Sequence, residues 1–450
     1  MVSKQFFGTD GIRGRFGVEP ITPLTVLKLG WAVGTVMRKH FGKGQILIGK
    51  DTRVSGYILE SALEAGISSA GMDVVMLGPV PTPAIAYLTR SARATAGVVI
   101  SASHNPFHDN GIKFFSSDGF KLSDEFELEI EQVLSEQMET VQPEELGKAS
   151  RMVSAADRYI EYCKSVLIED INFKGLKVAI DCANGAAYQV APKVFTELGA
   201  TVSIMHNLPN GFNINEKCGS THLADLQSFV LEEQCDLGIA FDGDADRVMM
   251  VDQKGQIVDG DQLLYTLVSS KHSMGDLKGG VVGTLMTNLG LEKRFQSLGI
   301  PFVRANVGDR YVLQGLQEND WYYGGESSGH LICLEKSTTG DGLLSALLVV
   351  EALSQRELTL SEIVSEYDVF PQRMINVSIS GARMSAKEIC ESKDVLSAVK
   401  LTEIELADAG RVLLRPSGTE PLIRVMVEGE NLELVNDCCE KLAKKVKELI

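Results

Sequence analysis

Short apolar runs alternate with longer helical patterns along most of this 450-residue chain, and this alternation limits the possible folds more than any other feature. Short runs bounded by Gly, Asp or Ser are typical of buried strands, and helical segments between them predict parallel strands with crossover helices. We therefore expect α/β units. The clearest runs span residues 45–49, 74–77, 97–100, 176–180, 237–241 and 281–283.

The length exceeds that of a single ordinary core, so we expect several domains. The pattern changes after residue 371: residues 410–430 predict two strands around a turn, and residues 435–449 repeat apolar side chains at the spacing of an amphipathic helix. We place domain boundaries near residues 155, 256 and 370. The predicted domains are then 1–155, 156–256, 257–370 and a C-terminal domain of 371–450.

Charge and hydropathy exclude several classes of partner. A formal net charge of −17 repels phosphates at long range and argues against nucleic acid. The longest apolar run, 343–350, is too short to cross a membrane, and the N-terminus contains no signal-peptide core, so we expect a cytoplasmic protein. The eight cysteines show no CxxC spacing, which makes zinc improbable.

Three predicted strands end in loops of unusual polar chemistry. We call them the serine loop (SASHNP, 101–106), the aspartate loop (DGDADR, 242–247) and the glutamate loop (GGESSGH, 324–330). Ligands of parallel α/β sheets bind beyond the carboxyl ends of the strands. The three loops are therefore expected to converge on one cleft.

The aspartate loop predicts a metal site. Asp242, Asp244 and Asp246 would repel one another unless a cation held them, although a solvated acidic turn is the alternative. An EF-hand is excluded, because Arg247 stands where that loop needs Gly and Gln253 where it needs Glu. Carboxylate oxygens suit Mg²⁺, which commonly takes a phosphate oxygen as a further ligand. Arg247 would bind that phosphate.

The serine loop offers a hydroxyl nucleophile beside His104, at the end of a strand. A serine in this position is more often a helix cap or turn former, and Ser101 is a candidate for that structural role. No Gly-x-Ser-x-Gly elbow is present in the loop, and no catalytic triad is identifiable.

Other polar segments suggest anion and sugar binding. Residues 44–50 nearly match a phosphate-binding P-loop, but they read as a strand, so nucleotide hydrolysis is rejected. The following segment, KDTRVSG (50–56), is either a basic binding loop or a solvated turn. RPSGTEPLIR (415–424) resembles a phosphate clamp, with a plain hairpin turn as the alternative. In the glutamate loop, Glu326 and Ser328 would face a sugar together with His330.

Five motifs in this order resemble the α-D-phosphohexomutase superfamily over essentially the whole chain. Besides the three loops they are TDGIRG (9–14) and RPSGTEP (415–421). The segments FFGTDGIRG, GFNINEKCGSTH (211–222), GTLMTNLGLE (283–292) and VGDRYV (307–312) are similar to its bacterial phosphoglucosamine mutases. The resemblance implies four domains, three similar mixed α/β units and a smaller α+β C-terminal domain, around a central cleft.

The resemblance also implies a mechanism. Ser103 would carry a phosphoryl group, pass it to glucosamine 6-phosphate to give the 1,6-bisphosphate, and take the other phosphoryl group back. Lys113, with a pKa lowered by neighbouring cations, or Arg13 would move the proton, and His104 would orient the loop. One Mg²⁺ would bind Ser103 and the three aspartates. The implied substrate-binding residues are Arg247, Arg310, Glu326, Ser328, His330, Arg415, Ser417, Gly418, Thr419 and Arg424.

The same resemblance implies a hexose 1,6-bisphosphate activator, a role in UDP-N-acetylglucosamine supply, and a monomer or homodimer without nucleic-acid or membrane partners. One residue departs from the family pattern, because Ser327 stands where Gln is expected, and this leaves sugar preference open. The alternatives are a phosphomannomutase or phosphoglucomutase, a metal-dependent sugar phosphohydrolase, and a calcium-binding protein without catalysis.

Overall fold

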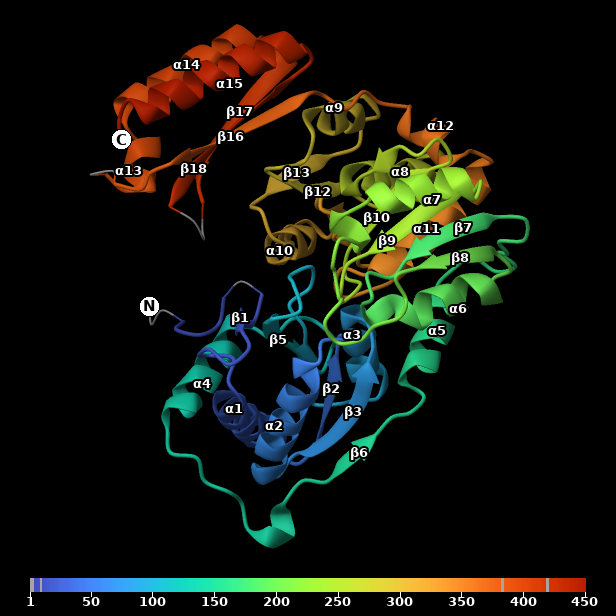
Figure 1. Cartoon of the computed structure of the whole chain (residues 1–450), viewed down its shortest axis with the longest axis vertical. Helices are drawn as coiled ribbons and strands as arrows, with labels where there is room; N and C mark the ends of the chain where they lie inside the picture. Colours follow the sequence, from blue (N-terminus) through green and yellow to red (C-terminus); the bar gives the residue numbers. More distant parts are fainter. Residues whose placement is uncertain (1–3, 9, 382–383, 418–420) are drawn as a thin grey trace. The chain divides into compact units, whose positions relative to one another are not determined.

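The computed structural model describes residues 4–8, 10–381, 384–417 and 421–450 of the chain (Figure 1). It divides into two compact units. The first comprises Met1–Thr284 and Ala305–Val364, and the second comprises Leu285–Arg304 and Ser365–Ile450.

The first sheet is mixed and has the strand order β1-β5-β4-β2-β3-β6. Strands β4, β2, β3 and β6 are parallel, whereas β5 and β1 are antiparallel to their neighbours. All five residues of β4 are buried, as its unbroken apolar sequence predicts. The strands are β1 (Ile12–Arg15), β2 (Gln45–Lys50), β3 (Asp73–Pro79), β4 (Ala96–Ile100), β5 (Asp109–Ser116) and β6 (Ala149–Arg151).

Helices α1 (Pro23–Phe41) and α2 (Ser55–Ser69) pack closely against each other (Figure 1). The close approach depends on Gly66, because a Cβ there would lie 2.1 Å from the carbonyl oxygen of Leu27. Tryptophan, leucine and valine side chains of α1 and leucine and isoleucine side chains of α2 then join the core of the first sheet. The helices of this part of the chain are α1 (Pro23–Phe41), α2 (Ser55–Ser69), α3 (Thr82–Ser91), α4 (Asp124–Ser135) and α5 (Ala155–Ser165).

The second sheet has the order β11-β10-β9-β7-β8 and places the aspartate loop. Strands β9 and β10 pair antiparallel, with Phe241 opposite Val248, so residues 242–247 connect two strands and not two helices. This arrangement confirms the objection to an EF-hand. The elements are β7 (Lys177–Asp181), α6 (Val190–Glu197), β8 (Thr201–Met205), α7 (Ala224–Glu232), β9 (Leu237–Phe241), β10 (Val248–Asp252) and β11 (Ile257–Val258).

The third sheet places the glutamate loop between β14 and β15. Strand β12 is parallel to β14, and β14 is antiparallel to β15. Strand β13 (Phe302–Ala305) crosses the boundary between the two units. The remaining elements of this part of the first unit are α8 (Gly260–Ser273), β12 (Val281–Thr284), α10 (Asp309–Asn319), β14 (Tyr323–Gly325), β15 (Leu331–Cys333), α11 (Gly342–Arg356) and α12 (Leu360–Val364).

A buried carboxylate, Asp341, caps the first turn of α11. Its Oδ1 accepts hydrogen bonds from the Tyr159 hydroxyl (2.7 Å) and the Leu344 N–H (2.9 Å). Burial raises the pKa of Asp341 from its ordinary value of 3.8 to about 6. The folded protein therefore holds this proton more tightly than the unfolded chain does, and the stability contributed by the neutral acid is lost as the pH rises through 6.

Replacing Asp341 with asparagine should remove this pH dependence while keeping an acceptor for the helix cap. We expect the stability of the wild type relative to Asp341→Asn to fall by about 1–1.5 kcal/mol between pH 5 and pH 7.5. Urea unfolding of both proteins at the two pH values measures the change. An identical pH dependence in the two proteins would contradict the assignment.

The second unit contains a three-stranded antiparallel sheet of order β16-β18-β17. Helices α14 and α15 lie side by side (Figure 1), and α15 packs on this sheet through Val435, Cys439, Leu442 and Val446. The elements are α9 (Leu289–Ser297), β16 (Gln372–Ser378), α13 (Ala386–Cys390), α14 (Lys393–Leu406), β17 (Gly410–Pro416), β18 (Leu422–Gly429) and α15 (Leu432–Lys447). The predicted strand pair and closing helix are therefore confirmed.

The six apolar runs singled out in the sequence all form strands, and the predicted mixed α/β sheets are confirmed. Within the described residues, every helix is too short or too polar to span a membrane. Short 3₁₀ helices complete the secondary structure at Pro143–Glu145, Ala186–Tyr188, Gly219–Thr221 and Ala407–Ala409.

Candidate active site

The serine, aspartate and glutamate loops meet in the first unit of the structure. The Ser103 hydroxyl donates a hydrogen bond of 2.5 Å to Oδ2 of Asp242. Nδ1 of His330 lies 3.7 Å from Oδ1 of Asp246. One site is therefore formed by loops that follow three different strands. The first and last of these loops are more than 200 residues apart in the sequence.

The backbone of the serine loop separates the roles of its two serines. Ser103 has a left-handed backbone with φ of 52°, which is uncommon for a residue other than glycine. The Ser101 hydroxyl accepts the N–H of Ser103 at 2.9 Å, so it stabilises this turn. Ser101 is thus turned into the loop, while the Ser103 hydroxyl faces Asp242 of the aspartate loop.

The three aspartates of the aspartate loop are buried and close enough to share one cation. One carboxylate oxygen from each lies within 4.8 Å of the others. Burial, followed by the charges of Asp246 and Asp244, raises the pKa of Asp242 well above its usual value. Among the described residues, Oδ1 of Asp244 and Oδ1 of Asp246 have no hydrogen-bond donor. Such oxygens are the ligands that a hard divalent cation such as Mg²⁺ requires, so the residues fit this ion.

A second group, Asp181, His206 and Cys218, also brings potential ligand atoms within 4.8 Å of one another. Here the carboxylate is already engaged: Asp181 accepts the backbone N–H groups of Ala183 and Gly219, both at 2.8 Å. His206 lies 3.1 Å from the same carboxylate. These contacts account for the buried Asp181 as a loop-stabilising group, in contrast to the aspartate loop.

Lys113 extends from β5 into the site and is almost fully buried. Its Nζ lies 3.2 Å from Asp10, 3.3 Å from Asp244 and 3.4 Å from Asp246. Burial alone would lower the pKa of Lys113, but the three carboxylates outweigh burial and raise it well above its usual value. The sequence-based expectation of a pKa lowered by neighbouring cations is therefore wrong, because the nearest charges are negative.

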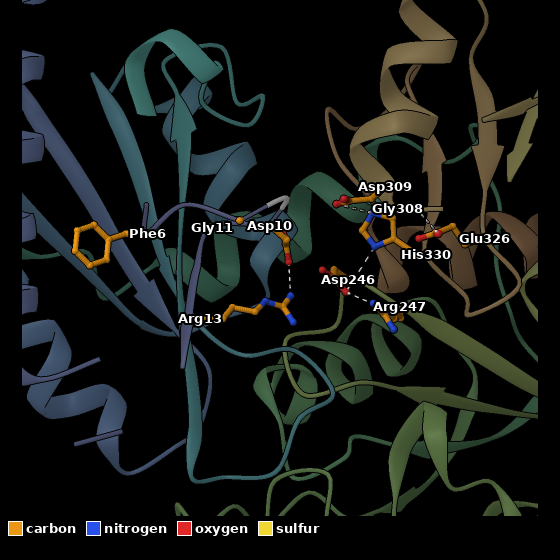
Figure 2. Close-up of a pocket in the computed structure, with 11 residues that line it drawn as sticks. Phe6, Asp10, Gly11, Arg13, Asp246, Arg247, Gly308, Asp309, Glu326 and His330 are labelled. Atoms are coloured by element: carbon orange, nitrogen blue, oxygen red, sulfur yellow. Dashed lines mark hydrogen bonds and ion pairs between the residues drawn. The ribbon is translucent and has the colours of Figure 1, made fainter. Parts of the chain in front are cut away.

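A polar cavity of about 400 Å³ opens beside this cluster (Figure 2). Arg13 from β1 points into it and pairs with Asp10, and Glu326 accepts the N–H of Gly308 at 2.9 Å. Both signs of charge therefore face the cavity, which suits a ligand that carries both an anionic group and hydroxyl groups. The cavity is lined by Phe6, Gly8, Asp10, Gly11, Arg13, Asp246, Arg247, Gly308, Asp309, Glu326 and His330.

The pKa values of the two histidines of the site are shifted in opposite directions. Burial and the cations Arg247 and Arg13 lower the pKa of His104 to about 4, so its ring is neutral at neutral pH. Its Nδ1 lies 3.4 Å from the Ser103 hydroxyl. Burial would also lower the pKa of His330, but carboxylates led by Asp246 raise it.

Two of the expected substrate-binding residues of the first unit lie elsewhere. Ser328 is exposed, whereas Glu326 and His330 of the same loop line the cavity. The Arg310 guanidinium pairs with Asp124 at the start of α4. The glutamate loop therefore presents only part of its predicted set to the cavity.

The remaining expected phosphate-binding residues belong to the second unit. Arg415 on β17 stands directly opposite Arg424 on β18. Burial and the charge of Arg424 lower the pKa of Arg415. Ser417 donates its backbone N–H to Leu422 at 2.9 Å, and Gly418 and Thr419 lie outside the described residues. Two facing arginines at a strand end are suited to a dianion.

Sequence reasoning missed several residues that build the site. Arg53 belongs to the segment for which a solvated turn was an equal alternative, yet its side chain is fully buried and bonds the carbonyls of Ser103 and Asn105. Asn215 contacts the same two carbonyls. Asp309 pairs with Lys121, which also bonds Asp10. Asn215 lies in the segment 211–222 and Asp309 in the segment 307–312. Both segments resemble the family, and this resemblance is the sequence signal that could have identified the two residues.

Family models for phosphoglucomutase/phosphomannomutase match almost the entire chain. The alpha/beta/alpha domains I, II and III match residues 4–141, 157–255 and 259–370, respectively. The C-terminal domain of the same family matches residues 374–445.

Curated relatives are similar over the full length of the chain. The phosphoglucosamine mutase of Hahella chejuensis is 56% identical over 99% of each chain. That of Haemophilus influenzae strain PittEE is 54% identical over 100% of each chain.

Solved structures share the fold at low identity. A phosphoglucomutase/phosphomannomutase family protein from Burkholderia thailandensis has a TM-score of 0.80 at 22% identity, covering 99% of this chain and 98% of that one. N-acetylphosphoglucosamine mutase of Aspergillus fumigatus, in complex with GlcNAc-6P and magnesium, has a TM-score of 0.71 at 17% identity, covering 99% and 96%.

Proposed function

Because this chain belongs to the phosphoglucomutase/phosphomannomutase family, we propose that it is an isomerase that interconverts glucosamine 6-phosphate and glucosamine 1-phosphate. Full-length relatives named phosphoglucosamine mutase, 54–56% identical, support this choice of sugar. The observation that carries the chemistry is the Ser103 hydroxyl, which lies 2.5 Å from a buried aspartate cluster beside a polar cavity.

In this proposal the active protein carries a phosphoryl group on Ser103. The O1 hydroxyl of glucosamine 6-phosphate attacks the phosphorus, the bond to the Ser103 oxygen breaks, and the 1,6-bisphosphate forms. The sugar then turns over, its O6–phosphorus bond breaks, and the phosphoryl group returns to Ser103. In the first transfer one proton leaves the sugar hydroxyl and one is taken up by the serine oxygen, and the second transfer reverses this movement.

Lys113 is suited to supply the proton to the serine oxygen. Its contact with Asp244 holds the ammonium group at the aspartate loop, and the carboxylates that raise its pKa include Asp244 and Asp246, whose charge a bound cation would offset. Arg13 keeps its positive charge at the cavity wall and would offset the charge of a sugar phosphate. We assign neutral His104 the role of orienting the serine loop.

Asp242, Asp244 and Asp246, together with an oxygen on Ser103, would hold one Mg²⁺. Among the described residues, Oδ1 of Asp244 and Oδ1 of Asp246 accept no hydrogen bond, and this supports the assignment together with the raised pKa of Asp242. When bound, the ion would stabilise negative charge that develops on the phosphoryl oxygens.

Two groups of residues would grip the sugar phosphate. Arg247, Glu326 and His330 line the cavity and would bind the sugar and its reacting end. Ser328 and Arg310 would join them only after a local change, because in this structure neither is among the residues that line the cavity. For the non-reacting phosphate we propose Arg415, Ser417, Gly418, Thr419 and Arg424.

We further propose a cytoplasmic enzyme, active as a monomer or homodimer, which a hexose 1,6-bisphosphate activates by phosphorylating Ser103. Its product would enter UDP-N-acetylglucosamine synthesis. The domains would be 1–155 with the serine loop, 156–256 with the metal site, 257–370 with the sugar site and 371–450 with the phosphate site.

Turnover with glucosamine, glucose and mannose 6-phosphates, each with Mg²⁺ and a hexose 1,6-bisphosphate, tests the reaction and the sugar. We expect the 1-phosphate of glucosamine to form fastest, without stoichiometric release of inorganic phosphate. Faster turnover of glucose or mannose 6-phosphate would identify a phosphoglucomutase or phosphomannomutase. Phosphate release in place of isomerisation would identify a phosphohydrolase.

A further inference from the structure

We infer that Asn215 and Arg53 are positioning residues that hold the nucleophile in its reactive conformation. The inference rests on the proposed function, because it assigns a reactive role to Ser103. Both side chains donate hydrogen bonds to backbone carbonyl oxygens of the serine loop. Together they form what we call the carbonyl clamp.

The two side chains of the carbonyl clamp bind the same two oxygens. Nδ2 of Asn215 donates to the carbonyl oxygens of Ser103 (2.8 Å) and Asn105 (3.0 Å). Nη2 of Arg53 donates to the same oxygens at 3.2 Å and 2.5 Å, respectively. The carbonyls of Ser103 and Asn105 are thereby satisfied by side chains, and the turn between them is held in place.

The conformation that the clamp holds is one that Ser103 would not favour by itself. Its φ of 52° lies in the left-handed region, which crowds any residue with a Cβ atom. A conformation of this kind persists where the surroundings over-determine it. Here the clamp binds the carbonyl group of Ser103, and the Ser101 hydroxyl accepts a hydrogen bond of 2.9 Å from the N–H of Ser103.

The clamp also sets the serine loop against the aspartate loop. Asn215 belongs to the second domain of the family, whereas Ser103 belongs to the first. Gly243 of the aspartate loop lies against both Ser103 and Asn215. A Cβ at this position would be 2.6 Å from the Ser103 carbonyl oxygen and 2.7 Å from Nδ2 of Asn215. The amide thus fixes the nucleophile relative to the neighbouring Asp242.

Asn215→Asp tests the clamp with almost no change in shape. The carboxylate cannot donate to the two carbonyl oxygens and repels them. We expect kcat per mole of phosphorylated Ser103 to fall about 10- to 100-fold, with KM changed by less than about 3-fold, because the nucleophile is misplaced while the sugar site is intact. Asn213→Asp is the matched control on the same loop and is expected to keep wild-type kcat, since among the described residues the Asn213 side chain bonds only Asn210 and Leu208.

The readouts separate positioning from general stability. A merely structural Asn215 would lower Tm and the phosphorylated fraction but leave kcat per phosphoserine unchanged, and that result would overturn the inference. Asn215→Ala, which removes the donors without repulsion, should show a smaller loss of the same kind and serves if the aspartate variant does not fold. A wild-type chain without mutase activity would refute the proposed function, whereas an active wild type with unimpaired clamp variants would refute the clamp alone.

Discussion

Replacing Ser103 with alanine is expected to lower mutase turnover by at least about a thousandfold, because the variant has no oxygen to carry the phosphoryl group. Its fold should persist, since the Ser101–Ser103 backbone contact does not use the removed hydroxyl. Conversion of glucosamine 6-phosphate in the presence of Mg²⁺ and hexose 1,6-bisphosphate measures the effect.

Ser101→Ala is the informative comparison for this variant. It removes the acceptor of the Ser103 N–H, so activity should fall because the turn is less well held, yet phosphorylation should still occur at Ser103. Full activity of Ser103→Ala, or loss of phosphorylation only in Ser101→Ala, would show that the nucleophile has been misassigned.

Replacing Asp244 with asparagine is expected to cause the second-largest loss, at least about a hundredfold in turnover at a fixed Mg²⁺ concentration. The substitution removes one of three charges that would bind the ion. It also weakens the contact of Asp244 with Lys113 at 3.3 Å, whereas the Thr82 hydroxyl can still donate to the amide oxygen. Calorimetric titration with Mg²⁺ should show weaker binding.

Chelation offers an independent check on the same site. Treatment of the wild type with EDTA should abolish turnover, and added Mg²⁺ should restore it. Asp225→Asn, at an exposed position near the start of α7, is a matched control that should leave both Mg²⁺ binding and turnover intact. Unchanged Mg²⁺ affinity in Asp244→Asn would exclude the aspartate loop as the metal site.

The parts of the fold that follow from local pattern were predictable. The apolar sequence of β4 predicts a buried strand, and the spacing of Val435, Cys439 and Leu442 predicts a helix with one buried face. Both patterns involve only residues close together in the sequence. The grouping of Asp242, Asp244 and Asp246 was predictable for the same reason, because the three carboxylates occupy one six-residue loop and repel one another wherever that loop lies.

Features that depend on distant residues were not predictable in this way. The surroundings of Lys113 combine carboxylates from positions 10, 244 and 246, so the sign of its pKa shift follows only from the tertiary structure. Arg53 has the sequence context of an exposed basic turn, and its burial depends on carbonyl acceptors about 50 residues away. Arg310 pairs with α4, a contact that its own motif does not encode.

The choice between Ser101 and Ser103 shows where family resemblance and local reasoning differ. Position alone allowed either serine to cap a turn, and resemblance favoured Ser103. The structure supplies a physical distinction, because the backbone turn places one hydroxyl on an N–H group and the other on Asp242.

Mapping of the phosphoryl group tests the central claim most directly. The intact mass of the purified protein, before and after phosphatase treatment, should differ by one phosphoryl group, which peptide mapping should place on Ser103. Hexose 1,6-bisphosphate should then restore both the group and the activity. A group on Ser101, or full mutase activity in a protein that never carries a phosphoryl group, would contradict the account.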